Sequence, residues 1–168
     1  MKKILLTLFI IGFSAMHSFA QSRGRSTGIF SIGFEAGLPT GDAHHLFGSV
    51  LGGSLKYELP IERSTWFTIS GGYNSFQPKG VYSDIGGPAI NAIPLKVGVK
   101  YYFDQGFFGE AQIGAAFFTG AADGTAFAYS PGIGYSFRDG FELGLRYEGW
   151  SKDGTLGQAG LRLAYRFR

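Results

Sequence analysis

Residues 93–103 read Ile93-Pro94-Leu95-Lys96-Val97-Gly98-Val99-Lys100-Tyr101-Tyr102-Phe103. In this stretch large apolar side chains mostly occupy every second position, and proline, small or charged residues fill most of the positions between them. Because successive side chains of a β-strand point to opposite faces, the period of two predicts a strand with one apolar and one polar face.

The same alternation recurs along the chain. It predicts eight strands, over residues 28–38, 49–59, 65–75, 91–103, 107–118, 125–137, 141–150 and 156–167. Strands of about ten to twelve residues are long enough to cross a bilayer at a tilt, and an even number suits a single-chain outer-membrane barrel. Pro94 and Pro131 fall inside predicted strands, where each removes a hydrogen-bond donor, so we expect bulges or shifted strand ends there.

The predicted connections alternate in length. Three are short, at residues 60–64, 104–106 and 138–140, and the others, mostly longer, are at 39–48, 76–90, 119–124 and 151–155. Short turns are typical of the periplasmic side of an outer-membrane barrel and longer loops of the outer side. The alternation therefore predicts that both termini are periplasmic.

The beginning of the chain is typical of a secretory signal peptide. Lys2 and Lys3 precede an apolar run from Ile4 to Phe13, and Ser18-Phe19-Ala20 supplies small residues for cleavage after Ala20. We therefore expect a signal peptide over 1–20 and a single barrel domain over 21–168. Loss of the signal lowers the net charge from +3 to about +1, and the remaining basic residues are scattered, which argues against a nucleic-acid partner.

Alternation alone does not say which face points outward, since a soluble lipocalin-like barrel has its apolar face inside. The polar face here is rich in glycine, serine and alanine, which suits the narrow interior of eight strands. Aromatic residues gather near the short turns, as in an aromatic girdle at a membrane interface. The ten predicted girdle residues are Tyr57, Phe67, Tyr101, Phe103, Phe107, Tyr135, Phe137, Phe141, Tyr165 and Phe167.

The polar face also carries both signs of charge in similar number. Its charged residues are Glu35, Lys56, Glu58, Lys96, Lys100, Glu110, Glu142, Arg146, Glu148, Arg162 and Arg166. Buried ions need partners, so an inward-facing arrangement predicts a paired network that fills the lumen. Ion pairs on a water-facing sheet would give the same sequence pattern.

Three motifs carry a family resemblance: Gly33-Phe34-Glu35-Ala36-Gly37-Leu38-Pro39-Thr40-Gly41-Asp42, the stretch 93–103, and Gly144-Leu145-Arg146-Tyr147. With them the chain resembles the small outer-membrane β-barrel proteins of the OmpA/OmpX/OmpW-like superfamily over nearly all of residues 21–168. The resemblance implies an all-β, eight-stranded antiparallel up-and-down transmembrane barrel. The resemblance also implies that outer-membrane lipid and lipopolysaccharide surround the barrel.

The last strand resembles the C-terminal signal read by the outer-membrane assembly machinery, which we expect as a partner during insertion. That signal usually ends in an aromatic residue, whereas here Phe167 is penultimate and Arg168 follows.

The sequence offers no catalytic motif. His44 and His45 are adjacent in the first long loop, beside Asp42 and near Ser49, but this spacing is typical of solvated loop residues. We expect no enzyme activity, metal or cofactor. Trp150, at the end of the seventh strand, is expected to anchor the outer rim or to cap the lumen.

The expected function is that of a monomeric barrel with a largely filled polar lumen and a structural or surface-interaction role, through loops 39–48 and 76–90. The alternative is a narrow, porin-like channel for small or hydrophobic solutes, which needs a wet path or an opening between strands.

Overall fold

The computed structural model describes residues 28–41, 43–80, 84, 86–120, 124–152 and 154–167. The predicted signal peptide lies outside these residues. Eight strands are present: β1 (Ile29–Thr40), β2 (Phe47–Pro60), β3 (Thr65–Pro78), β4 (Ile90–Tyr102), β5 (Phe107–Gly120), β6 (Gly124–Ser136), β7 (Phe141–Ser151) and β8 (Thr155–Phe167). A short helix, α2 (Ala43–Leu46), precedes β2. The predicted strands are confirmed, and β2 and β3 extend further toward the longer loops than expected.

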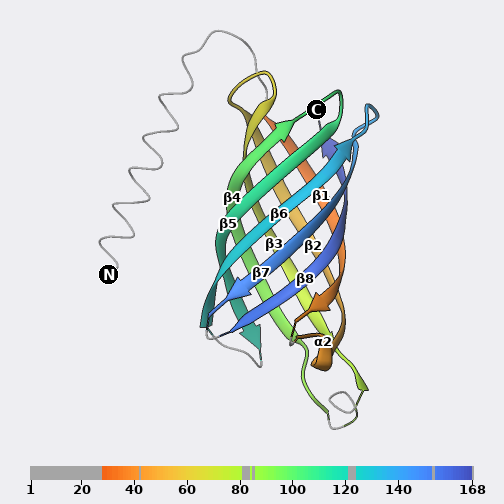
Figure 1. The fold of residues 1–168 in the computed structure, drawn as a ribbon, viewed down its shortest axis with the longest axis vertical. Coiled ribbons are helices and arrows are strands. Elements are labelled where there is room, and N and C mark those ends of the chain that lie inside the picture. Colours follow the sequence, from red (N-terminus) through yellow and green to blue (C-terminus); the bar gives the residue numbers. More distant parts are fainter. Residues whose placement is uncertain are drawn as a thin grey trace, which may run out of the picture.

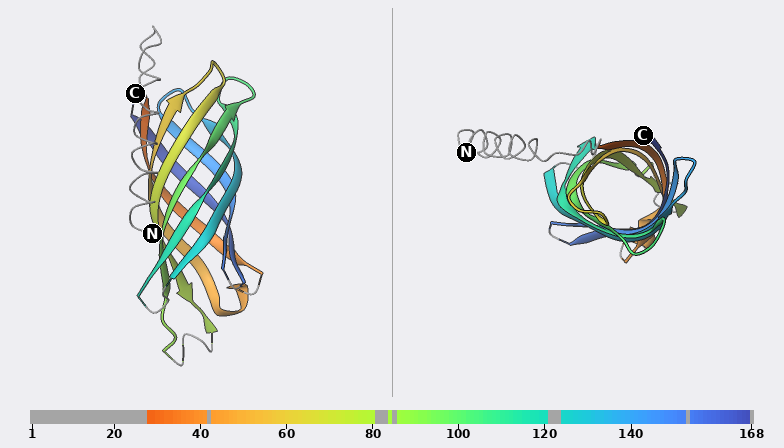
Figure 2. Two further views of the ribbon diagram at one scale, coloured as in Figure 1. Left: turned by 90° about the vertical axis from the view of Figure 1, so that its left-hand side faces the viewer. Right: turned by 90° about the horizontal axis from the view of Figure 1, so that it is seen from above.

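The strands form a closed barrel. Each strand pairs antiparallel with the next in the chain, and β1 closes the barrel by pairing with β8 from Phe30↔Phe167 to Thr40↔Gly157. Figure 1 shows the tilted strands, and the view along the barrel in Figure 2 shows the closed ring. The predicted all-β, up-and-down barrel is therefore confirmed. In the described part of the chain, no helix has the length and apolar character needed to cross a membrane.

The side chains alternate between the inside and the outside of the barrel. In β4, Lys96 and Lys100 are buried, whereas Leu95, Val97 and Val99 are exposed. Charged groups inside and large apolar groups outside are the reverse of a water-soluble barrel, because large apolar surfaces are stable only when another apolar medium covers them. The distribution is that of a barrel surrounded by lipid.

The expectation of bulges at Pro94 and Pro131 is wrong. The register between β3 and β4 is the same on both sides of a short gap at Pro94, and the register between β6 and β7 is likewise unchanged across Pro131. Each proline pairs normally with β5 on its other side, as Pro94↔Ala116 and Ala111↔Pro131. A proline lacks one donor, so the ladder omits two residue pairs toward one neighbour without inserting a residue.

The two ends of the barrel differ. The turns after β2, β4 and β6 lie at one end, together with the start of β1 and the end of β8, and we call this the short-turn end. Helix α2 and the connection between β3 and β4 lie at the opposite end, which we call the loop end (Figure 1).

Candidate functional site in the barrel interior

The predicted charged residues lie inside the barrel. They come from β1, β2, β4, β5, β7 and β8, at positions whose neighbours in sequence point outward. Nine of the eleven side chains are 0–7% exposed, while Glu110 is 15% and Arg146 is 16% exposed. Because an isolated buried ion is costly, each must find a partner across the lumen.

Glu142 on β7 is the centre of one group of charges, the Glu142 cluster, which lies toward the short-turn end. Its Oε1 accepts from Lys56 Nζ at 3.1 Å and from Arg162 Nη1 at 3.3 Å. Its Oε2 pairs with Lys100 and lies 3.5 Å from Arg166 Nε. One carboxylate therefore holds together basic side chains from β2, β4 and β8.

Glu58 and Glu110 complete the Glu142 cluster. Glu58 accepts from Lys100 Nζ at 2.8 Å and from Arg166 Nη2 at 3.1 Å. Glu110 accepts from Lys56 Nζ at 3.1 Å. The Lys100 ammonium also lies 4.0 Å from the ring centre of Phe108, a cation–π contact. Every cation of this cluster thus has at least one carboxylate in reach.

Hydroxyl groups extend the Glu142 cluster. Ser136 Oγ donates to Glu142 Oε2 at 2.9 Å and lies 3.0 Å from the hydroxyl of Tyr102. Arg162 donates through Nε to Ser54 and through Nη2 to Ser31. The small polar residues of the inward face therefore solvate the ions in place of water.

A second group, the Glu148 cluster, lies further toward the loop end. Glu148 pairs with Lys96 Nζ at 2.6 Å and with Arg146 Nη2 at 3.0 Å, and its Oε1 accepts from Trp150 Nε1 at 2.9 Å. Arg146 also pairs with Glu35 on β1. Arg162 Nε lies 3.8 Å from Glu35, so Arg162 connects the two clusters.

The two clusters contain six basic and five acidic side chains. The basic ones are Lys56, Lys96, Lys100, Arg146, Arg162 and Arg166, and the acidic ones are Glu35, Glu58, Glu110, Glu142 and Glu148. With every group ionised, the clusters carry one positive charge in excess.

Buried apolar side chains lie at the loop end of the interior, and we call them the apolar cap. The rings of Phe76 and Trp150 are 5.3 Å apart, those of Phe47 and Phe76 are 5.7 Å apart, and Phe118 lies 5.7 Å from Trp150. Alanines from β4, β5 and β6 pack around them. Trp150 therefore lies inside the lumen and caps it.

Sequence reasoning missed most of the apolar cap. The sequence pattern places Phe76 in the predicted loop 76–90 and Phe47 in the predicted loop 39–48. The signal was present: Phe76, Phe118 and Trp150 continue the inward phase of their strands, where large apolar residues are otherwise rare. Extending the third predicted strand by one residue adds Phe76, whereas Phe118 and Trp150 already lie within predicted strands. Phe47 is on the inside only because the register shifts between Phe47 and Ser49.

The ten aromatic residues predicted as a girdle lie near the short-turn end. All point away from the lumen, and all but the half-buried Phe67 are exposed. Several pack edge to face, including Tyr101 with Phe103 at 5.4 Å and Tyr165 with Phe167 at 5.1 Å. Phe30, which the sequence analysis did not include, stacks on Phe167 at 6.0 Å.

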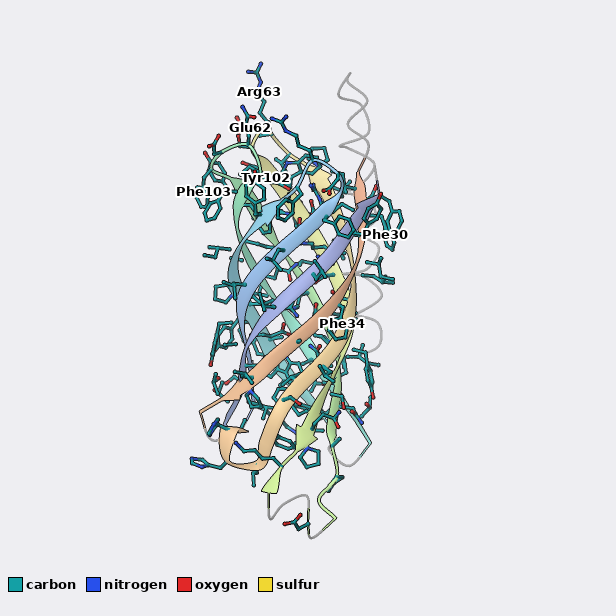
Figure 3. The ribbon with its side chains drawn as sticks, turned by 90° about the vertical axis from the view of Figure 1, so that its right-hand side faces the viewer. Phe30, Phe34, Glu62, Arg63, Tyr102 and Phe103 are labelled. Atoms are coloured by element: carbon teal, nitrogen blue, oxygen red, sulfur yellow. The ribbon has the colours of Figure 1, made fainter. Side chains whose placement is uncertain are left out.

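Figure 3 shows Phe30, Phe34 and Phe103 projecting from the barrel wall. Tyr102, one residue before Phe103, is on the opposite face of the strand, and its hydroxyl reaches Ser136. The alternation thus continues to the last residues of β4.

The histidines occupy a different part of the molecule. His44 and His45 are exposed on α2, with ring centres 5.9 Å apart, and Asp42 lies outside the described residues. Across the described ranges, no three His, Cys, Asp or Glu side chains are arranged as a metal site.

Comparison with known proteins gives structural matches. No protein-family model and no curated protein sequence matches the chain. The structure of Ail, the attachment invasion locus protein of Yersinia pestis, is similar with a TM-score of 0.61 and 18% identity, over 83% of this chain and 97% of that one. The N-terminal β-barrel domain of Pseudomonas aeruginosa OprF is similar with a TM-score of 0.50 and 16% identity, over 83% and 97%.

The outer membrane enzyme PagL is also similar, with a TM-score of 0.57 and 18% identity over 80% of this chain and 98% of that one. The same architecture therefore occurs in an enzyme and in proteins of other kinds, and it does not define an activity. With its closed ring of eight antiparallel strands and its inward-facing charges, this chain has the fold of the small outer-membrane β-barrels of the OmpA/OmpX-like type.

Proposed function

We propose that the chain is a monomeric outer-membrane barrel that is closed to ions and has a structural or surface-interaction role. The observation that carries this proposal is the pairing of charges across the lumen, from β2 and β4 to β7 and β8. The apolar cap adds a second obstruction at the loop end. A hydrated ion would have to separate buried ion pairs, and breaking one such pair costs about 3–5 kcal/mol.

The orientation that we propose places the short-turn end in the periplasm and the loop end outside the cell. Outer-membrane lipid and lipopolysaccharide would surround the exposed apolar side chains, with the aromatic girdle at the periplasmic interface. The assembly machinery would act on β8 during insertion.

The surface available for partners is then the loop end. His44, His45 and Leu46 are exposed there, on α2 between β1 and β2. The structurally similar Ail is an attachment protein by name, which supports a role in contact with other surfaces. We infer a non-catalytic role, since both histidines of residues 21–168 are exposed on α2 and the interior has no histidine to act as a base.

The test is the ion conductance of the refolded protein, residues 21–168, in a planar bilayer. Heat-modifiable migration on a gel first shows that the barrel has folded. We expect a folded barrel that gives no discrete openings. Reproducible openings would contradict the proposal and favour the narrow channel, with the charges of the two clusters as its selectivity residues.

A further inference from the structure

The outer face of β3 changes its chemistry step by step from the middle of the barrel to the loop end. Every second residue of the strand faces away from the lumen, and Asn74 and Phe76 between them are buried inside. The outward series is Gly71, Tyr73, Ser75 and Gln77, and Lys79 continues it one residue beyond the strand. The series thus passes from a bare backbone through an aromatic ring, a hydroxyl and an amide to an ammonium group. A lipid has the same order of polarity, from its chain to its head.

An apolar hollow lies at the beginning of this series. Its volume is about 710 Å³, and it extends over the outer faces of β1, β2, β3 and β4. Its floor is low at Gly53 and Gly71, which lie on neighbouring strands. A Cβ added at Gly53 would meet only the carbonyl oxygen of Gly33, at 3.6 Å. Isoleucine, leucine and aromatic side chains surround this floor, so the hollow has the apolar lining that an acyl chain needs.

Three uncharged polar side chains, which we call the polar trio, lie beyond Tyr73 toward the loop end. Ser75 Oγ donates to Asn91 Oδ1 at 2.6 Å, and Gln77 Nε2 donates to Ser75 Oγ at 2.8 Å. All three side chains are half-buried. Among the described residues, Asn91 Nδ2 and Gln77 Oε1 have no hydrogen-bond partner. One is a donor and the other an acceptor, so together they match the N–H and the oxygen of an amide.

Lys79 supplies a positive charge at the end of the series. Its backbone amide donates to the carbonyl oxygen of Leu46 on α2 at 2.9 Å, at the loop end of the barrel (Figure 1). The stem of its side chain lies against Gly48, where a Cβ would be 3.3 Å from Lys79 Cβ. In the part of the chain that the structure describes, Lys79 has no acidic partner. Its ammonium group is therefore available to an anion from outside the chain, and lysine is a good phosphate ligand.

We propose that the outer face of β3 binds one molecule of lipopolysaccharide through its lipid A part. One acyl chain lies in the hollow, the amide that joins this chain to the glucosamine meets the polar trio, and a phosphate of the sugar meets Lys79. A phosphoglyceride has a chain and a phosphate but no such amide, so the polar trio distinguishes the two lipids. The inference rests on the proposed orientation, which places the loop end in the outer, lipopolysaccharide-containing leaflet.

The experiment uses the refolded barrel, residues 21–168, in phosphatidylcholine nanodiscs. Diphosphorylated lipid A is added in increasing mole fraction, and its binding is followed by the NMR shifts of the backbone amides. Phosphatidylglycerol, an anionic lipid without the amide, is added in a parallel titration. Because the protein is purified, this measurement does not depend on how the barrel is oriented in a cell.

Three pairs of variants test the three parts of the site. Gly53→Leu fills the hollow, and Ala159→Leu is its control, on the outer face of β8 and away from the hollow. Lys79→Gln removes the charge, and Lys152→Gln is its control, in the exposed connection after β7. For the polar trio the variant is Asn91→Leu, and the control is Thr125→Val, at an exposed position of β6. Heat-modifiable migration shows which variants have folded.

We expect shifts that saturate with lipid A and that are largest within residues 71–79. Gly53→Leu should weaken binding about tenfold, the effect of losing roughly two buried methylene groups. Lys79→Gln should weaken it about two- to fivefold, as for one exposed ion pair. Asn91→Leu should reduce the preference for lipid A over phosphatidylglycerol about two- to tenfold. The three control variants should bind as the wild type does.

Any of three results would overturn the proposal: shifts that do not saturate, equal binding of lipid A and phosphatidylglycerol by the wild type, or equal effects of Lys79→Gln and Lys152→Gln. Equal binding of the two lipids would mean that β3 attracts any anionic lipid. None of these results bears on the closed barrel, which the conductance tests. The orientation is tested separately, by labelling from outside the cell, so a failure of the lipid A site and a failure of the proposed function are distinguishable.

Discussion

Glu142 illustrates how a single side chain organises the interior. An ionised carboxylate has two oxygens that only accept hydrogen bonds, and here they face Lys56, Lys100 and Arg162, with Ser136 as a further donor. Few positions in a narrow barrel allow one acid to reach three strands. The removal of its charge should therefore affect the molecule more than the removal of any peripheral acid.

We expect Glu142→Gln to lower the free energy of unfolding by about 3–5 kcal/mol, because it leaves buried cations without their shared anion. Glu110→Gln is the control. Glu110 is 15% exposed and its basic partner, Lys56, also contacts Glu58 and Glu142, so the loss should be much smaller. Urea unfolding in detergent micelles, followed by tryptophan fluorescence, measures the free energy of unfolding of both variants. Equal losses would argue against the central place of Glu142.

Two inward-facing glycines differ in the space around them. A Cβ at Gly98 would overlap the carbonyl oxygen of Ala111 and lie 2.8 Å from Gln112 Cα, whereas at Gly144 the nearest atom is 3.7 Å away. Gly98→Ala should destabilise the barrel by about 1–3 kcal/mol through overpacking. Gly144→Ala should be neutral or stabilising by about 0.5–1 kcal/mol. Unfolding midpoints that do not separate the two variants would contradict this packing.

At the scale of the element, the strands and their up-and-down order were predictable, whereas their ends and the effect of the prolines were not. The alternation predicted both ends of β4 to within one residue. This was possible because Ile93, Leu95, Val97 and Val99 all point to the outer, lipid-facing side of the barrel. The effect of Pro94 was mispredicted, since the missing donor is tolerated on one side when the pairing on the other side continues. The longer β3 was missed because Phe76 and Pro78 resemble the loop that follows.

Val97 tests the outward face of a strand. It lies near the middle of β4, is exposed, and pairs with Ile69 and Ile113. Val97→Arg should lower stability in lipid by about 2–4 kcal/mol if this position is at the bilayer midplane. Ile61→Arg, in the exposed turn after β2, is the control and should cost about 0–1 kcal/mol, as expected near an interface. Near-wild-type stability of Val97→Arg would contradict a lipid-facing wall.

For the whole molecule, the sequence indicated the barrel but not which side chains contact each other inside it. Whether Lys56 contacts Glu142, eighty-six residues away, depends on the stagger of all the strands between them. Alternation fixes the face of a side chain and leaves its height open. The apolar cap depends on the same stagger, so it emerges only from the folded barrel.

The orientation in the membrane is tested with cysteine, which this chain lacks. Glu62→Cys places a thiol in an exposed turn at the short-turn end (Figure 3), and His45→Cys places one on α2 at the loop end. With the proposed orientation, a membrane-impermeant maleimide should label intact cells that carry His45→Cys but not Glu62→Cys. Both should react after the cells are opened. Labelling of Glu62→Cys in intact cells would reverse the orientation.

The pairing of β1 with β8 has a consequence for how the chain is made. The first strand has no second neighbour until the last one is available, and the segments joined are separated by most of the domain. In lipid an unpaired strand edge is costly because no water replaces the missing hydrogen bonds. A chain truncated before β8 would leave two such edges, so quality control of this protein is in effect a check on the thirteen residues of β8.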